Sequence, residues 1–177
     1  GKYSITKPYE SLQIVKIMSD ILGNLEDKIL TDGTACMGGD CIRFSRYYKH
    51  INAFEINKDN YKILIRNCKT FEVKNINVHN LNYNDYISKT KQDVIYLDPQ
   101  WGGPDYKLEG HITLKVGTSD LSSILQHISE KGLAKYVFIK APFNVQLKGI
   151  HYSKINVIFN KFKNPSFLLI IVPIKCE

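Results

Sequence analysis

The chain has 177 residues, 44% of them hydrophobic, which is enough for one domain with a sizeable core and too few for two. Lys and Arg outnumber Asp and Glu by 24 to 17, and the formal net charge of +7 favours an anionic partner such as RNA over a membrane. No apolar run is long enough for a signal peptide or a transmembrane helix, and the four cysteines lack zinc-ligand spacing, so we expect an intracellular protein with reduced thiols.

Helices and strands are expected to alternate through the first half of the chain. Apolar residues recur at helical spacing over residues 9–22, and Gly23 with Asn24 ends that helix. Further along, the pattern predicts strands over residues 28–32, 50–55 and 75–79, separated by helices over residues 40–48 and 57–68. This alternation is typical of an α/β protein with a parallel sheet.

The loop after the first strand reads Asp32-Gly33-Thr34-Ala35-Cys36-Met37-Gly38-Gly39-Asp40. An acid at a strand end, followed by small residues and a helix start, is how a Rossmann-like methyltransferase passes close to S-adenosylmethionine. Glu55 ends the second strand about twenty residues further on, where an acid accepts hydrogen bonds from ribose hydroxyls. The alternatives are a tight turn without a ligand and a solvated glutamate.

The most informative stretch is Asp93 to Tyr106, which reads DVIYLDPQWGGPDY. Residues 94–97 suit a fully buried strand of a parallel sheet, and the strand stops at Asp98 and Pro99. Polar and flat groups therefore follow at the carboxyl edge of the sheet, where open α/β folds bind ligands.

An acid, a proline, a spacer and an aromatic residue suit methyl transfer to an exocyclic amine of a base. Asp98 can accept a hydrogen bond from the amine as positive charge develops, and Pro99 fixes the backbone so that a carbonyl accepts the second N–H. Trp101 offers a face for stacking, best for a cationic ring such as N7-methylguanine, and two glycines let the chain turn beside it. The alternative is a plain turn whose tryptophan caps the core.

The rest of the chain, from residue 107 onward, completes the predicted sheet. Residues 107–118 show no clear period and are expected to form a surface loop that closes over the target. A helix over residues 119–131, a strand over residues 135–140 and two strands over residues 153–159 and 166–173 should follow. The last two suit an antiparallel hairpin at the edge of the sheet.

Three patches of this sequence resemble the RNA cap guanine-N2 methyltransferases, the trimethylguanosine synthase family. The segment WGGPDY matches that family's P-P-W-G-G-P-D-Y motif, with Gln100 in place of its second proline. The loop from Asp32 matches D-x-F-x-G-x-G-G-N except at Thr34, Cys36 and Asp40, and residues 3–8 resemble F-S-V-T-P-E with Lys7 inserted.

The resemblance implies a single Rossmann-like class I methyltransferase domain over residues 1–177. Its sheet would be mostly parallel with an antiparallel C-terminal edge hairpin and helices on both faces, and residues 1–8 would pack over the methyl donor. The cofactor would be S-adenosylmethionine, with no metal. The residues expected to hold the cofactor are Ser4, Thr6, Asp32, Gly38, Glu55, Asn82 and Asp98.

The substrate implied by the resemblance is 7-methylguanosine-capped RNA, methylated at N2 of the cap guanine. Asp98, Pro99 and Trp101 would be catalytic. The residues expected to contact the substrate are Trp101, Gly102, Pro104, Asp105, Tyr106 and Asn144. Lys140 or Lys148 would suit cap phosphates, although surface lysines are usually just solvated.

Two other functions remain open from the sequence. The enzyme could methylate another nucleobase amine in RNA or DNA, or the chain could be a silent cap- or RNA-binding module, since Cys36 and Gln100 depart from the family pattern. We expect a monomer in the nucleus or cytoplasm. The abundance of Asn, Ile and Lys suggests an AT-rich genome, of a virus or a protozoan.

Overall fold

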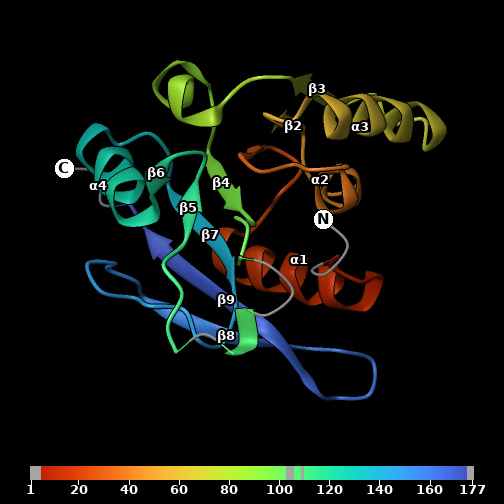
Figure 1. Ribbon diagram of the computed structural model, residues 1–177. Helices are drawn as coiled ribbons and strands as arrows, with labels where there is room; N and C mark the ends of the chain where they lie inside the picture. Colours follow the sequence, from red (N-terminus) through yellow and green to blue (C-terminus); the bar gives the residue numbers. More distant parts are fainter. Residues whose placement is uncertain (1–4, 103–105, 109, 175–177) are drawn as a thin grey trace.

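The computed structural model describes residues 5–102, 106–108 and 110–174, and its centre is a seven-stranded sheet (Figure 1). The strand order is β3-β2-β1-β4-β7-β9-β8, in which β9 runs antiparallel to both of its neighbours and all other pairs are parallel. The strands are β1 (Ile29–Asp32), β2 (His50–Phe54), β3 (Ile76–His79), β4 (Val94–Leu97), β7 (Tyr136–Ala141), β8 (Lys154–Phe159) and β9 (Pro165–Pro173).

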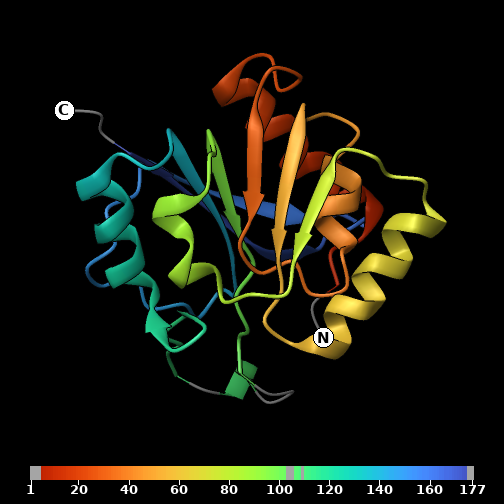
Figure 2. The same cartoon turned by 90° about the horizontal axis from the view of Figure 1, so that it is seen from above.

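Helices cover both faces of this sheet (Figure 2). On one side lie α1 (Pro8–Leu22), α2 (Gly39–Phe44) and α3 (Lys58–Thr70). On the other lie α4 (Leu121–Lys131) and the 3-10 turns η1 (Tyr83–Asp85) and η2 (Ile87–Lys89). This arrangement is the Rossmann-like fold of class I methyltransferases, and the predicted antiparallel edge hairpin is confirmed.

The topology places one edge of the sheet where a ligand can bind. From β1 the chain adds strands outward through β2 to β3, and then returns to add β4 and β7 on the other side of β1. Asp32 pairs with Tyr96 in the parallel register, so β1 and β4 end side by side. The crevice between two strands whose crossovers run in opposite directions is the usual ligand site of open α/β sheets.

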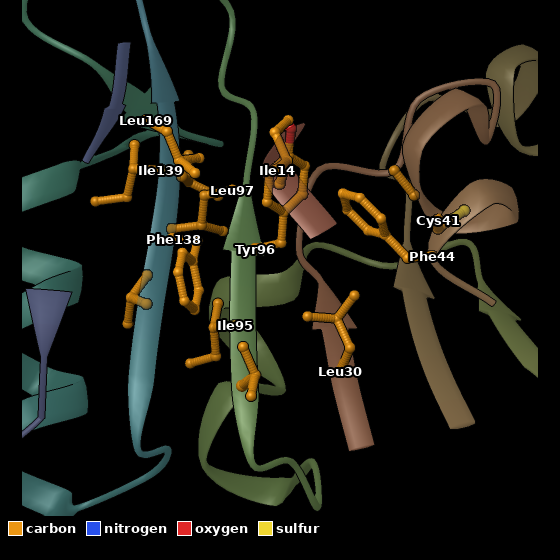
Figure 3. Packing of buried hydrophobic residues seen from close by; sticks show 14 of the residues in the cluster. Ile14, Leu30, Cys41, Phe44, Ile95, Tyr96, Leu97, Phe138, Ile139 and Leu169 are labelled. Atoms are coloured by element: carbon orange, nitrogen blue, oxygen red, sulfur yellow. The ribbon is translucent and has the colours of Figure 1, made fainter. Parts of the chain in front are cut away.

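Strand β4 is the buried centre of the core, because all four of its residues are inaccessible to solvent. Tyr96 points toward Ile14 and Phe44, while Ile95 and Leu97 point to the opposite face (Figure 3). The Tyr96 and Phe44 rings meet edge to face with centroids 5.0 Å apart, a favourable aromatic geometry. The residues that precede Asp98 are therefore held rigidly from both sides.

Helix α1 is tied to the C-terminal hairpin, which fixes the approach of the N-terminal segment. Pro8 occupies the first helical turn, and the Glu10 carboxylate accepts a hydrogen bond from the Lys7 backbone N–H at 2.7 Å. The other carboxylate oxygen of Glu10 accepts from the Ser166 hydroxyl at 2.7 Å. Residues 5–7 consequently enter the fold beside β9.

The predicted surface loop over residues 107–118 is wrong in part. This region contains η3 (Tyr106–Leu108) and a two-stranded hairpin of β5 (Lys115–Val116) and β6 (Ser119–Asp120). Ile112, Leu114 and Val116 are buried, and Ile112 bridges to Val145. The helix after the donor loop also ends earlier than predicted, at Phe44. None of the helices that the structure describes has the length and apolar character needed to cross a membrane.

Candidate donor and base site

A cavity of about 1170 Å³ lies at the carboxyl ends of the central strands. Its walls come from the N-terminal segment, the glycine-rich loop, the ends of β2 and β4, the turn before η1 and the β5–β6 hairpin. The predicted donor residues that line it are Thr6, Asp32, Gly38, Glu55, Asn82 and Asp98. Ser4 lies outside the described residues.

The loop after β1 passes close to neighbouring side chains, and its glycines make this possible. A Cβ on Gly33 would lie 2.5 Å from the Tyr83 ring and 2.8 Å from Leu97. Gly38 has a φ of 91°, in the left-handed region that favours glycine, and it precedes α2. Cys36 also adopts a positive φ of 48° although it carries a side chain, which marks it as the occupant of a glycine-like position.

Acidic side chains line the cavity at the ends of β1, β2 and β4, and Arg43, Arg46 and Lys115 also contribute to its lining. Asp32 is 2% exposed, and burial, followed by repulsion from Asp40, raises the pKa of its carboxyl group well above the usual value. Its Oδ1 accepts a hydrogen bond from the Thr34 backbone N–H at 3.1 Å. Glu55 is also buried and accepts from the Asn57 N–H at 2.6 Å. The cavity thus favours a cationic or hydroxyl-rich ligand.

Thr6 anchors the N-terminal segment to this acidic group. Its hydroxyl donates a hydrogen bond to Asp40 Oδ2 at 2.8 Å and accepts one from Lys140 Nζ at 2.9 Å. Asp40 Oδ2 also accepts from the Tyr96 hydroxyl at 3.0 Å, and Arg43 donates to the Thr6 carbonyl. Thr6 therefore lies at the cavity wall, held there by side chains of α2, β4 and β7.

Asp98 holds its carboxylate in a mixed environment. Oδ2 accepts from Lys140 Nζ at 2.8 Å, whereas Oδ1 is buried and has no hydrogen-bond partner among the described residues. The pKa of this carboxyl is raised to about 6. Burial is the largest cause of the rise, Lys140 opposes it, and Asp40 adds to it. Asp98 is thus mostly ionised at neutral pH, and within the described part of the chain one of its two acceptor oxygens makes no hydrogen bond.

Lys140 was expected at the surface, and this prediction is wrong. Its side chain is 1% exposed, because it belongs to a strand whose neighbours Phe138, Ile139 and Ala141 are fully buried. Its ammonium lies 4.9 Å from the centroid of the Phe167 ring and 5.5 Å from that of Trp101. A lysine inside a continuous apolar strand run was the sequence signal for this burial.

Trp101 does not present the open stacking face that the sequence suggested. The side chain is 7% exposed and is not part of the cavity wall, whereas its neighbours Gln100 and Gly102 are. The Tyr106 ring meets it edge to face with centroids 5.4 Å apart. Its Nε1 is buried without a partner among the residues described. The indole therefore caps the core in this conformation, as the alternative prediction stated.

The predicted substrate residues after Trp101 fall into two groups. Pro104 and Asp105 lie outside the described residues. Gly102 is exposed at the cavity and has a φ of 99°, which turns the chain beside the strand end. Asn144 donates from Nδ2 to the Tyr106 carbonyl at 2.8 Å, so its amide holds the chain that covers the indole.

Asn82 closes the cavity at the end of β3. Its Oδ1 accepts a hydrogen bond from the Asn84 N–H at 3.3 Å and caps η1. Asn84 in turn donates to the Val116 carbonyl at 2.6 Å, which brings the β5–β6 hairpin over this wall. In the described part of the chain, no group of three or more His, Cys, Asp or Glu side chains is arranged to hold a metal ion.

Known structures with low sequence identity share this fold. An RNA methyltransferase from Salinibacter ruber in complex with S-adenosyl-L-homocysteine aligns with a TM-score of 0.60 at 15% identity, covering 93% of this chain and 92% of the other. The T. thermophilus 16S rRNA N2 methyltransferase in complex with AdoMet and guanosine aligns with a TM-score of 0.69 at 11% identity, covering 96% and 43%.

Sequence comparisons connect the chain to one family. An uncharacterized protein of Acanthamoeba polyphaga mimivirus is 30% identical over 147 residues, which cover 81% of this chain. The match covers 57% of that relative's length. A family model described as RNA cap guanine-N2 methyltransferase matches residues 27–167, well over half of the sequence. The chain belongs to the RNA cap guanine-N2 methyltransferase family.

Proposed function

We propose that this chain transfers a methyl group from S-adenosylmethionine to the exocyclic N2 of an N7-methylguanosine RNA cap. The observation that carries the proposal is the Oδ1 acceptor of Asp98, which follows β4 at the cavity wall and has no hydrogen-bond partner among the described residues. The family membership supplies the substrate class.

The residues of the cavity fit the methyl donor. The sulfonium and the amino group of the donor need a negative potential. The ribose hydroxyls need hydrogen-bond acceptors, and the adenine needs an amide or an acid beside it. Asp32 and Glu55 follow β1 and β2 at the cavity wall, and Asn82 lies beyond β3. We assign Asp32 to the charged end of the donor, Glu55 to the ribose and Asn82 to the adenine. When bound, the donor supplies an electrophilic methyl group.

Asp98 and Pro99 would act on the nucleophile. An amine conjugated into a purine is a weak nucleophile, so its two N–H groups must be held and its developing positive charge stabilised. Oδ1 of Asp98 and the Pro99 carbonyl are the acceptors we assign to this task. With a pKa of about 6, Asp98 is the carboxylate near neutral pH and a neutral acid in mildly acidic solution.

Base stacking on Trp101 requires a change from the conformation described here. The Tyr106 ring packs against the indole at a steep angle, and the Asn144 amide holds the Tyr106 backbone. We propose that the base displaces Tyr106 when it binds. The buried Nε1 of Trp101, which finds no partner in the described part of the chain, supports this step, because a buried indole N–H without an acceptor is destabilising and gains from a rearrangement that hydrates it.

One observation favours a second candidate, a guanine that lacks the 7-methyl group. The Lys140 ammonium lies 5.5 Å from the centroid of the Trp101 ring. A cationic base stacked on that ring would be repelled by this charge, whereas a neutral guanine would not. The ion pair with Asp98 weakens the repulsion, so we keep the methylated cap as the leading substrate.

Mass spectrometry tests the proposal directly. The protein and S-adenosylmethionine are incubated with a cap dinucleotide that carries or lacks the 7-methyl group, and with adenosine-containing RNA. A gain of one or two methyl masses on the 7-methylated cap alone supports the proposal. Methylation of the unmethylated cap or of adenosine assigns the alternative substrates, and no methylation with intact donor binding indicates a silent module.

Two variants separate the base site from the donor site. Trp101→Ala should abolish methylation while calorimetry shows nearly unchanged donor affinity. Phe162→Ala serves as the matched control, because its ring is 72% exposed. Equal loss of donor binding in Trp101→Ala would mean that the indole only supports the core, and would contradict its role with the base.

A further inference from the structure

Lys140 is buried in a way that lysines seldom are. It is 1% exposed, near the carboxyl end of β7, and its ammonium meets the Asp98 carboxylate at 2.8 Å and the Thr6 hydroxyl at 2.9 Å. An ammonium removed from water loses several kcal/mol of solvation unless hydrogen bonds and an opposite charge replace it. This buried charge therefore indicates a task beyond packing.

The parallel register explains why the lysine reaches Asp98. Leu97, the last residue of β4, pairs with Ile139 of β7, so Asp98 follows β4 beside Lys140, which still belongs to β7. On its other side, Lys140 pairs with Leu169 of the antiparallel β9, and the Phe167 ring lies 4.9 Å from the ammonium. The backbone thus holds the charge at the strand end.

We propose that Lys140 is a positioning residue, which keeps Asp98 ionised and turned so that one carboxylate oxygen remains available to the target amine. This inference rests on the proposed function. Because Lys140 occupies Oδ2, the acceptor left for a substrate N–H is Oδ1, which has no partner among the described residues. The lysine acts through Asp98 and need not touch the substrate.

The negative charges around Asp98 explain why it needs Lys140 to stay ionised. Asp40, at the start of α2, and Asp32, at the end of β1, interact electrostatically with Asp98, and the buried Tyr96 hydroxyl belongs to β4 itself. Burial and Asp40 raise the pKa of Asp98, and Lys140 is the main group that lowers it. Without Lys140 the pKa would rise above 6, and a protonated Asp98 would donate a hydrogen bond where the amine needs an acceptor.

A titration of Asp98 tests the proposal without measuring activity. Protein labelled with ¹³C at the aspartate carboxyls is followed by NMR from about pH 4 to pH 9, and Asp98→Asn identifies the signal. In Lys140→Met the midpoint of the Asp98 titration should rise by at least about one pH unit. Lys135→Met, which removes an exposed charge just before the same strand, should leave it unchanged. An unchanged midpoint in Lys140→Met overturns the proposal.

Lys140→Gln provides a second variant in case the methionine variant does not fold. The amide still donates a hydrogen bond to Asp98 but carries no charge, so the midpoint should rise in this variant too. A midpoint that stays at the wild-type value in Lys140→Gln contradicts the charge-based role.

The pH dependence of methylation gives the functional readout. The acidic limb of kcat/KM in the wild type should follow the Asp98 titration, and in Lys140→Gln it should move to higher pH by the shift that NMR records. A uniform loss at every pH would mean that Lys140 only supports the structure. If wild type methylates none of the tested substrates while the NMR shift occurs, the proposed function fails and the control of Asp98 ionisation by Lys140 stands.

Discussion

The Thr34 hydroxyl accepts a hydrogen bond from the Asp98 backbone N–H at 2.7 Å, and this contact joins the loop after β1 to the loop after β4. The first loop lines the donor cavity, and the second carries the acid that we assign to the target amine. A methyl transfer requires both reactants to be placed within a fraction of an ångström. Thr34 therefore links the two halves of the site through one side chain.

Thr34→Val should separate these halves at nearly constant volume. The Asp98 N–H loses its acceptor, and leaving a partly buried donor unpaired costs about 1–3 kcal/mol. Urea unfolding should show that loss, and kcat should fall more than donor affinity because Asp98 is displaced. Thr34→Ser keeps the hydroxyl and serves as the control. A valine variant with wild-type stability and kcat would show that the contact has no role in placing Asp98.

Gly33→Ala should destabilise the same loop for a steric reason. The added methyl would lie 2.5 Å from the Tyr83 ring and 2.8 Å from Leu97, and both side chains are buried. Forcing such contacts in a packed core costs about 1–3 kcal/mol. Gly39→Ala is the matched control, because its Cβ would meet nothing within 4 Å. Equal unfolding free energies for the two variants would show that the core around Tyr83 adapts freely.

The fold was largely predictable because its signals are local. Short apolar runs bounded by turn residues identified all seven strands of the main sheet to within one or two residues. The prediction of a surface loop was wrong around β5 and β6. The segment contains glycines and charged residues, which favour a loop, but Ile112, Leu114 and Val116 alternate with other residues and indicate a face that packs inward. A surface loop would not place apolar residues at every second position.

The candidate site was only partly predictable, since its chemistry depends on contacts between distant segments. Asp32, Glu55 and Asp98 each end or follow a strand, a position that sequence patterns indicate well. The contact of Lys140 with Asp98 depends on the pairing of β4 with β7, and the buried indole of Trp101 packs against Tyr106 and against Phe167 of β9. Neither relationship is encoded within a single segment.

Cys36→Gly should change donor binding more than stability. Cys36 has a φ of 48° and lines the cavity, so glycine relieves backbone strain and removes the side chain from the donor's surroundings. The strain relief is offset by the greater entropy of the unfolded glycine chain, and the unfolding free energy should stay within about 1 kcal/mol of wild type. Calorimetry should show donor binding tighter by roughly threefold, or about 0.7 kcal/mol.

Cys36→Ala is the control that distinguishes the effect of the thiol on donor binding from the effect of the backbone conformation. It removes the thiol and keeps the Cβ at the positive φ, so it should recover less affinity than glycine. Weaker donor binding in both variants would mean that the thiol contacts the donor favourably, which contradicts the expectation that glycine suits this position.

Asp32→Asn should stabilise the ligand-free protein at neutral and alkaline pH. Burial and Asp40 raise the pKa of Asp32 in the folded state, so ionising it disfavours folding at any pH above its unfolded value of 3.8. The penalty grows as pH rises from that value through the folded pKa, and it is absent at lower pH where both states are protonated. Asparagine removes the penalty and retains an oxygen for the Thr34 N–H. Urea unfolding at pH 8 should show a gain on the order of 1 kcal/mol that vanishes toward pH 4.

Asp27→Asn should show the opposite sign. A hydrogen bond from Lys28 lowers the pKa of this exposed carboxyl, so its ionised form favours folding above the unfolded pKa, and asparagine should lose a little stability at pH 8. The two variants together distinguish the burial of Asp32 from a general effect of removing negative charge.

Asp32→Asn should also lose donor affinity, because the acid that destabilises the empty fold is the one we assign to the cationic end of the donor. An Asp32→Asn protein that is less stable than wild type at pH 8 would show that Asp32 is stabilised by groups around the cavity instead of penalised by them.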